Sequence, residues 1–179
     1  DAVVAEGFEA GGHNGRDETT SLCLIPQVAK QIKIPLIAAG GIATGRAMLA
    51  ALNLGADGVQ IGSRFVASVE SSAHEAFKNE VVASNEGDTI LTLKELTPVR
   101  LIKNEFYHSL EEAYKNGADP SELKTLLGRG RAKKGMFEGN IKEGELEIGQ
   151  ISGLINEIKP AAQIVDEIVS EYRAALKEQ

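Results

Sequence analysis

Residues 9–15 read Glu9-Ala10-Gly11-Gly12-His13-Asn14-Gly15 and come just after the apolar run Ala2-Val3-Val4-Ala5. An apolar run of this length is typical of a buried strand. Glycines after a strand let the backbone approach a ligand closely, and a histidine there can exchange a proton near neutral pH. This stretch therefore predicts a strand that ends in a ligand-binding turn.

Two further apolar runs end in turns of small residues. Residues 35–39 predict a second strand that leads into Gly40-Gly41, and residues 58–61 predict a third that leads into Gly62-Ser63. Helices are predicted between these strands, over residues 20–32 and 44–54, with Thr20 or Ser21 and Thr44 as caps. The β-α-β-α-β order predicts a parallel sheet with right-handed crossovers and one ligand site where its strands end.

The pattern changes after residue 67. Helices are predicted over residues 71–84, 109–116 and 121–127, and a last helix starts at Pro160. Its apolar stripe comprises Ile164, Val165, Ile168, Val169 and Tyr172. Residues 89–93 alternate like a half-exposed strand, whereas residues 99–106 fit either a strand or a helix. Residues 128–149 contain six glycines and many charges, which predicts a loop-rich segment.

The composition limits the kinds of function that the chain can have. The formal net charge of −7 argues against sequence-independent binding to nucleic acid or to an anionic membrane. No apolar stretch approaches the ~20 residues that span a bilayer. The single cysteine, Cys23, excludes an internal disulfide and fits a reducing compartment, so we expect a cytoplasmic protein. We also expect a longer complete polypeptide, because the chain begins within a predicted strand.

The glycine turns after the second and third strands suit a phosphate group. Backbone N–H groups freed by Gly40-Gly41 and Gly62-Ser63, together with the N-terminus of the Thr44-capped helix, can bind a phosphate dianion. The alternative is that these glycines serve the geometry of the turns only.

The titratable residues near the predicted strand ends also have two interpretations. His13 is either an acid/base group beside a substrate or a residue that orders its own loop. Arg64 can reach an anion or form an ion pair, and Glu6 and Glu9 can hold the turn. His74 and His108 are expected on helix surfaces or ends, and residues 129–134 on a solvated face. No metal site is predicted, since the three histidines are far apart in the sequence.

Three blocks of this sequence resemble the nitronate monooxygenase family, formerly called 2-nitropropane dioxygenases. These blocks are residues 4–15, 35–42 and 55–65, and they occur in the order and spacing of that family. The similarity extends through residues 99–104 and 149–155. The family includes the flavin-dependent enoyl-acyl-carrier-protein reductase II.

The resemblance implies an α/β fold, namely the C-terminal part of a (β/α)8 TIM barrel that holds FMN at its mouth. The three strands would be strands six to eight, residues 1–67 the barrel portion, and residues 68–179 closing helices and a helical, loop-rich extension. His13 would be the active-site histidine. The cofactor-binding residues would be Gly11, Gly12, Gly40, Gly41, Gln60, Gly62 and Ser63, and Ser63 stands where the family often has threonine.

Three activities follow from these observations. The first is oxidation of alkyl nitronates with O2 by an FMN-dependent monooxygenase. The second is reduction of enoyl thioesters by an NAD(P)H-dependent reductase of fatty-acid synthesis, and the third is a non-catalytic module that binds a phosphate ligand. The partner expected in every case is a small molecule, and the complete protein is expected to form a homodimer.

Overall fold

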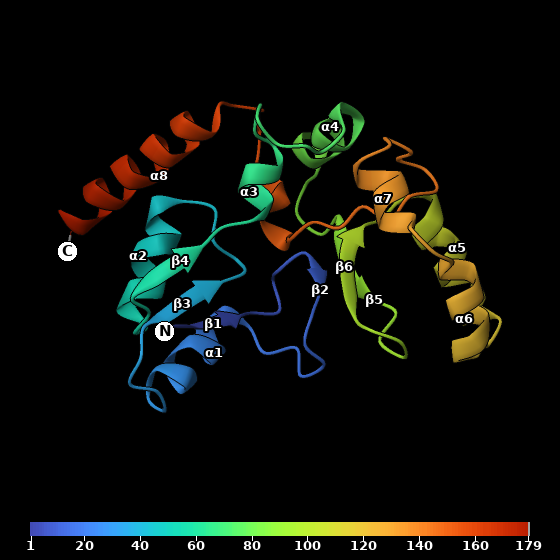
Figure 1. The fold of residues 1–179 in the computed structure, drawn as a ribbon, viewed down its shortest axis with the longest axis horizontal. Helices are drawn as coiled ribbons and strands as arrows, with labels where there is room; N and C mark the ends of the chain where they lie inside the picture. Colours follow the sequence, from blue (N-terminus) through green and yellow to red (C-terminus); the bar gives the residue numbers. More distant parts are fainter. Residues whose placement is uncertain (179) are drawn as a thin grey trace.

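The computed structural model of the protein describes residues 1–178 and contains a three-stranded parallel sheet at its N-terminal end (Figure 1). Strand β3 (Leu36–Ala39) lies between β1 (Val3–Glu6) and β4 (Gly58–Gln60). The register aligns Glu6 with Ala39 and Ala39 with Gln60, so the three strands end level with one another. The turns that follow them therefore meet at one edge of the sheet, as predicted.

Two helices connect these strands. Helix α1 (Ser21–Ala29) is shorter than predicted, and α2 (Gly45–Asn53) is capped by the Thr44 hydroxyl, which accepts from the Ala47 N–H at 3.2 Å. The cap of α1 comes from the carboxylate of Glu9, which accepts from the Ser21 N–H at 3.0 Å. The core between the sheet and these helices contains Ala5, Ile25, Leu36, Ala38, Ile42, Ala51 and Ala56.

A second sheet is antiparallel and has the order β2-β6-β5. It consists of β2 (Gly12–His13), β6 (Val99–Ile102) and β5 (Thr89–Thr92). The ambiguous residues 99–106 thus divide into strand β6 and the start of α5 (Glu105–Lys115), which Asn104 caps. Because β2 is the next strand after β1, the turn over residues 7–11 links the two sheets.

The remaining helices surround these sheets. They are α3 (Ser63–Val66), α4 (Glu75–Ala83), α6 (Pro120–Leu127), α7 (Arg131–Met136), the 3-10 helix η1 (Gln150–Leu154) and α8 (Ala161–Leu176). Figure 1 shows α5, α6 and α7 together at one end of the molecule and α8 beside α2 at the other. On α8, Ile164 and Ile168 are buried, whereas Val165 of the predicted stripe is 47% exposed.

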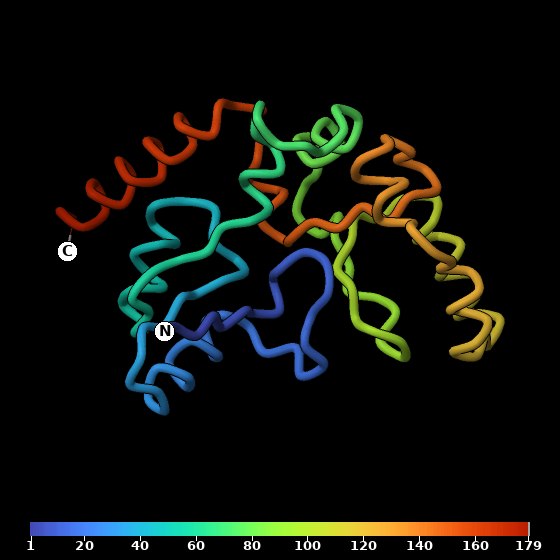
Figure 2. Tube along the Cα trace, viewed as in Figure 1, coloured from blue at the N-terminus to red at the C-terminus, as the bar shows by residue number. Residues whose placement is uncertain are grey.

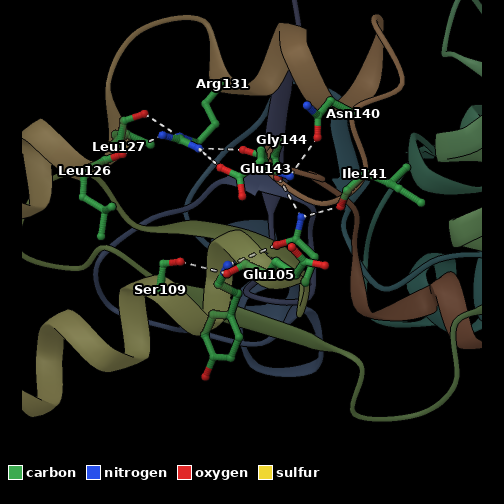
Figure 3. Close-up of polar contacts among 11 residues, drawn as sticks. Glu105, Ser109, Leu126, Leu127, Arg131, Asn140, Ile141, Glu143 and Gly144 are labelled. Atoms are coloured by element: carbon green, nitrogen blue, oxygen red, sulfur yellow. Dashed lines mark hydrogen bonds and ion pairs between the residues drawn. The ribbon is translucent and has the colours of Figure 1, made fainter.

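Residues 128–149 are more ordered than the expected loop. Arg131, in the charged run predicted as a solvated face, lies over the Phe106 ring at 4.3 Å. Its guanidinium donates to the carbonyl oxygens of Leu126, Leu127 and Glu143 (Figure 3). The expectation of a fully solvated face was therefore wrong for Arg131, because its side chain fastens α7 to the end of α6.

After α7 the chain returns to the sheets. Figure 2 shows this return, in orange, passing beside β6 before it reaches η1. The Ile102 N–H donates to the Leu146 carbonyl at 2.9 Å, and Leu101 pairs with Glu147 in an antiparallel bridge. Residues 145–151 consequently lie next to the turns at the end of the parallel sheet. Within residues 1–178, no helix has the length and apolar character needed to cross a membrane.

Candidate functional site

A cavity of about 230 Å³ opens at the edge where the parallel strands end. All three predicted turns contribute to its wall. The lining includes the seven residues expected to bind a cofactor, which are Gly11, Gly12, Gly40, Gly41, Gln60, Gly62 and Ser63. The structure therefore brings together three turns that are well separated in the sequence.

Most of the glycines in this wall are required by close contacts within the chain. Gly40 has a φ of +83°, and a Cβ there would lie 2.8 Å from the Gly7 carbonyl oxygen. A Cβ at Gly11 would lie 2.4 Å from the backbone nitrogen of Gly149. Gly62 differs, since a Cβ there would have no neighbour within 4 Å. Turn geometry thus accounts for Gly40 and Gly11, whereas Gly62 leaves free space at the cavity.

Some polar groups at this edge of the sheet already form hydrogen bonds within the chain. The Ser63 hydroxyl accepts from the Gly149 N–H at 2.9 Å, so its own proton remains available to another acceptor. At the N-terminus of α2, the Gly45 N–H donates to the Glu171 carboxylate at 2.8 Å. This part of the predicted phosphate site is therefore occupied by a side chain of α8.

His13 lies beside this cavity rather than in its wall. It is exposed on β2, where it pairs with Val99 of β6, and the preceding residue, Gly12, lines the cavity. The Asn14 amide donates to the Ala10 and Gly12 carbonyls and orders the turn. His13 is thus held by its backbone at the rim, with a ring that is open to the surroundings.

The sequence analysis missed part of the wall, namely Met136, Glu147, Ile148 and Ile151. Burial raises the pKa of the Glu147 carboxyl, and the nearby charge of His13 opposes this shift. Burial, followed by repulsion from Glu147, raises the pKa of Glu145 to about 7, while Arg131 acts in the opposite direction. The cavity therefore has an acidic side, formed by a segment that was expected to be a loop.

The other titratable residues named from the sequence lie elsewhere. His74 caps α4, and the exposed His108 contacts Glu111 at 2.9 Å. Arg64 is buried with its guanidinium 4.0 Å from Glu167, which matches the ion-pair alternative. Cys23 lies exposed on α1. Among residues 1–178, no three His, Cys, Asp or Glu side chains are grouped so that they could hold a metal ion.

The chemistry available at this edge combines backbone amides, one serine hydroxyl and proton-exchanging side chains. Gly41 and Gly62 both line the cavity, where the lack of a side chain lets an anion approach the backbone N–H groups. His13 and Glu147 contribute an imidazole and a carboxyl group, the two kinds of side chain that most often transfer protons to or from a substrate. The arrangement suits an anionic ligand next to a proton-transfer step.

Comparison with known proteins relates this arrangement to one family. The family model described as nitronate monooxygenase matches residues 1–171. A probable nitronate monooxygenase from Staphylococcus saprophyticus is 36% identical over 182 residues, which cover 96% of this chain and 50% of that protein. The chain thus spans about half the length of this curated relative.

Solved structures show the same similarity. FabK from Thermotoga maritima is 41% identical with a TM-score of 0.92, and the match covers 99% of this chain and 56% of that one. A nitroalkane oxidase from Streptomyces ansochromogenes is 30% identical with a TM-score of 0.79, and the match covers 99% of this chain and 53% of that one.

Proposed function

Because this chain belongs to the nitronate monooxygenase family, we propose that the complete protein is an FMN-dependent oxidoreductase that oxidises alkyl nitronates with O2. The observation that carries this proposal is the convergence of three strand-end turns on one cavity, whose wall contains Gly41, Gly62 and Ser63. A flavin bound there would supply the redox chemistry, while the protein positions the substrate and handles protons.

The residues of the cavity fit the phosphate end of FMN. We assign the phosphate to Gly40, Gly41, Gly62 and Ser63, because the open space at Gly62 admits a ligand atom close to the backbone. The free proton of the Ser63 hydroxyl can be donated to a phosphate oxygen. We assign the ring system to Gln60, Gly11 and Gly12, which form the adjoining part of the wall.

We assign the acid/base role to His13. Its exposed ring at the rim of the cavity can accept a proton from a substrate carbon or donate a hydrogen bond to a nitronate oxygen. The neighbouring Asn14 holds the turn through its amide, so the ring works from a fixed backbone.

We place β1, β3 and β4 as strands six to eight of a (β/α)8 barrel. In that arrangement residues 1–67 supply the barrel portion, and residues 68–179 are the closing helices and extension. Support comes from the edges of the sheet, since β1 and β4 each pair only with β3 among the described residues. We further propose a cytoplasmic homodimer whose only small-molecule partners are its cofactor and substrates.

A second candidate function is the NAD(P)H-dependent reduction of enoyl thioesters. One observation favours it, namely the segment from Gly149 to Gly153, which resembles the reductase branch of the family. In the structure the Gln150 N–H donates to the Glu9 carbonyl at 2.9 Å, and Ile151 lines the cavity. This segment also occurs in monooxygenase relatives, so the nitronate reaction is retained as the first proposal.

An anaerobic experiment on the complete flavin-loaded protein separates these functions. The protein is mixed with NAD(P)H in one series and with an alkyl nitronate in another, and the flavin absorbance is followed. Bleaching by nitronate alone supports the monooxygenase. Bleaching by NAD(P)H makes the reductase the better assignment, and purified protein without flavin contradicts both and leaves a phosphate-binding module.

A further inference from the structure

Glu147 reaches the cavity through long-range pairing. Its backbone forms an antiparallel bridge with Leu101 of β6, and the preceding Leu146 accepts from the Ile102 N–H at 2.9 Å. Strand β6 also pairs with β2, where His13 lies opposite Val99. The same strand therefore fixes the backbones of Glu147 and His13 on one rigid frame.

The carboxylate of Glu147 is packed against the residue that precedes His13. A Cβ at Gly12 would lie 2.6 Å from Oε2 of Glu147, so the carboxylate occupies the space that a side chain at this position would take. Both Gly12 and Glu147 line the cavity. The carboxylate of Glu147 thus lies in the cavity wall, next to Gly12 and one residue from His13.

The backbone pairings identify the partner of this carboxylate, since His13 lies opposite Val99 and Glu147 lies opposite Leu101, two residues further along the same strand. Burial raises the pKa of Glu147, and the charge that opposes this shift is that of His13. On its own segment Glu147 faces Glu145, an acidic neighbour, and Arg131 acts on Glu145 rather than on Glu147. The other acidic residues of the wall are Glu6 and Glu9, and the Glu9 carboxylate is held by Ser21.

We propose that Glu147 is a positioning residue for His13, whose carboxylate holds the protonated imidazole at the rim of the cavity. A carboxylate beside a histidine fixes the orientation of the ring and stabilises its charged form. This inference rests on the proposed function for the catalytic role of His13, whereas the pairing itself depends only on the folded chain.

The pairing is tested first without any activity measurement. In the complete protein the side-chain carboxyl of Glu147 is titrated by 13C NMR, in the natural sequence and in the His13→Ala variant. We expect removal of the imidazole to raise the pKa of Glu147 by about half a unit or more, because an opposite charge is lost. The control is His108→Ala, which removes an exposed histidine that contacts Glu111. An identical Glu147 titration in His13→Ala and in the natural sequence would overturn the proposal.

The positioning role is tested by kinetics on the flavin-loaded protein. We expect Glu147→Gln to lower kcat/KM about tenfold or more and to change the pH profile of kcat/KM, with flavin content unchanged. Glu147→Asp, which keeps the charge, should recover part of the rate, and the exposed Glu112→Gln should behave like the natural protein. A Glu147→Gln variant with the rate and pH profile of the natural protein would overturn the role. Absence of turnover with every substrate would instead reject the proposed function, and the NMR titration would still decide the pairing.

Discussion

Gly62 is a cavity residue at which a substitution should affect ligand binding but not the stability of the fold. Its φ of −100° and ψ of −68° are accessible to alanine, and a Cβ there meets no neighbour within 4 Å. We expect Gly62→Ala to leave the free energy of unfolding within about 0.5 kcal/mol of the natural value. Under the proposed assignment of Gly62 to the FMN phosphate site, its methyl group should nevertheless weaken FMN binding about tenfold, equivalent to ~1.4 kcal/mol.

The measurement is a flavin fluorescence titration of the complete protein, alongside urea unfolding. Gly15→Ala is the control, since it adds the same methyl group in open space away from the cavity wall. Natural FMN affinity in Gly62→Ala would remove Gly62 from the phosphate site.

Glu145 should make the stability of the protein depend on pH. Burial, with repulsion from Glu147, raises its pKa in the folded protein from the ordinary value of 4.5 to about 7. The folded state therefore holds the proton more tightly than the unfolded chain, so the free energy of unfolding falls as pH rises from about 4.5 to about 7. The decrease should be on the order of 2 kcal/mol and should level off at higher pH.

Urea unfolding at a series of pH values checks this expectation. In Glu145→Gln the decline should become clearly smaller, because the amide cannot ionise and only groups such as Glu147, whose pKa is also raised by burial, still contribute. The variant should be the more stable protein at pH 8. Glu112→Gln, an exposed change on α5, should keep the natural pH dependence. An unaltered decline in Glu145→Gln would mean that another group causes it.

At the scale of the elements, the close approach of α2 to α8 depends on Gly45. A Cβ at this position would lie 2.1 Å from the Tyr172 nitrogen and 2.3 Å from the Ile168 carbonyl oxygen. Gly45→Ala must therefore push the helices apart and disturb the hydrogen bond from Gly45 to Glu171. We expect a loss of about 2 kcal/mol in the free energy of unfolding, measured with urea. Gly62→Ala adds the same methyl group in open space, and equal stability of the two variants would contradict this packing argument.

The elements that the sequence predicted best are strands that appear as short apolar runs followed by glycine turns. The apolar runs before Gly40 and Gly62 became β3 and β4, and the turns after them met at one cavity as expected. Strand β6 remained ambiguous because all four of its residues, including Arg100, are buried, so it lacks alternation. Glu147 could not be predicted as a cavity residue, because it reaches the cavity through its pairing with Leu101 of β6, a residue distant in the sequence.

Helix α7 shows what local sequence could not reveal. Its six residues include Gly135 and three basic side chains, Arg131, Lys133 and Lys134, and helices this short are unstable alone. The helix is held by contacts with distant residues, namely the stacking of Arg131 on Phe106 and the close approach of Gly135 to Gly144. Such contacts appear only once the chain has folded.

At the scale of the whole molecule, Arg100 connects the antiparallel sheet to the turn after β1. Its guanidinium is buried, lies 4.4 Å from the centre of the Phe8 ring and donates twice to the Phe8 carbonyl oxygen, at 3.0 and 3.2 Å. Arg100 also sits opposite Gly12 in the register of β6 with β2. One side chain of β6, the strand that pairs with the His13 strand β2, therefore joins the antiparallel sheet to the turn after β1, which contributes to the cavity wall.

We expect Arg100→Lys to lower the free energy of unfolding by about 2 kcal/mol, because a lysine cannot stack on Phe8 and donate two fixed hydrogen bonds together. Hydrogen exchange should show faster exchange at Ala10 and Gln150, whose N–H groups bond to carbonyls of the same turn. Arg16→Lys is the matched control, since the exposed Arg16 makes two hydrogen bonds to carbonyl oxygens, those of Lys94 and Leu96. This variant should lose less than about 0.5 kcal/mol in the free energy of unfolding. If both variants lower the free energy of unfolding by the same amount, the burial of Arg100 does not make its contact between the two sheets more stabilising than an exposed one. If only Arg100→Lys opens the turn, the geometry of the cavity depends on the contact between β6 and this turn and not on the parallel strands alone.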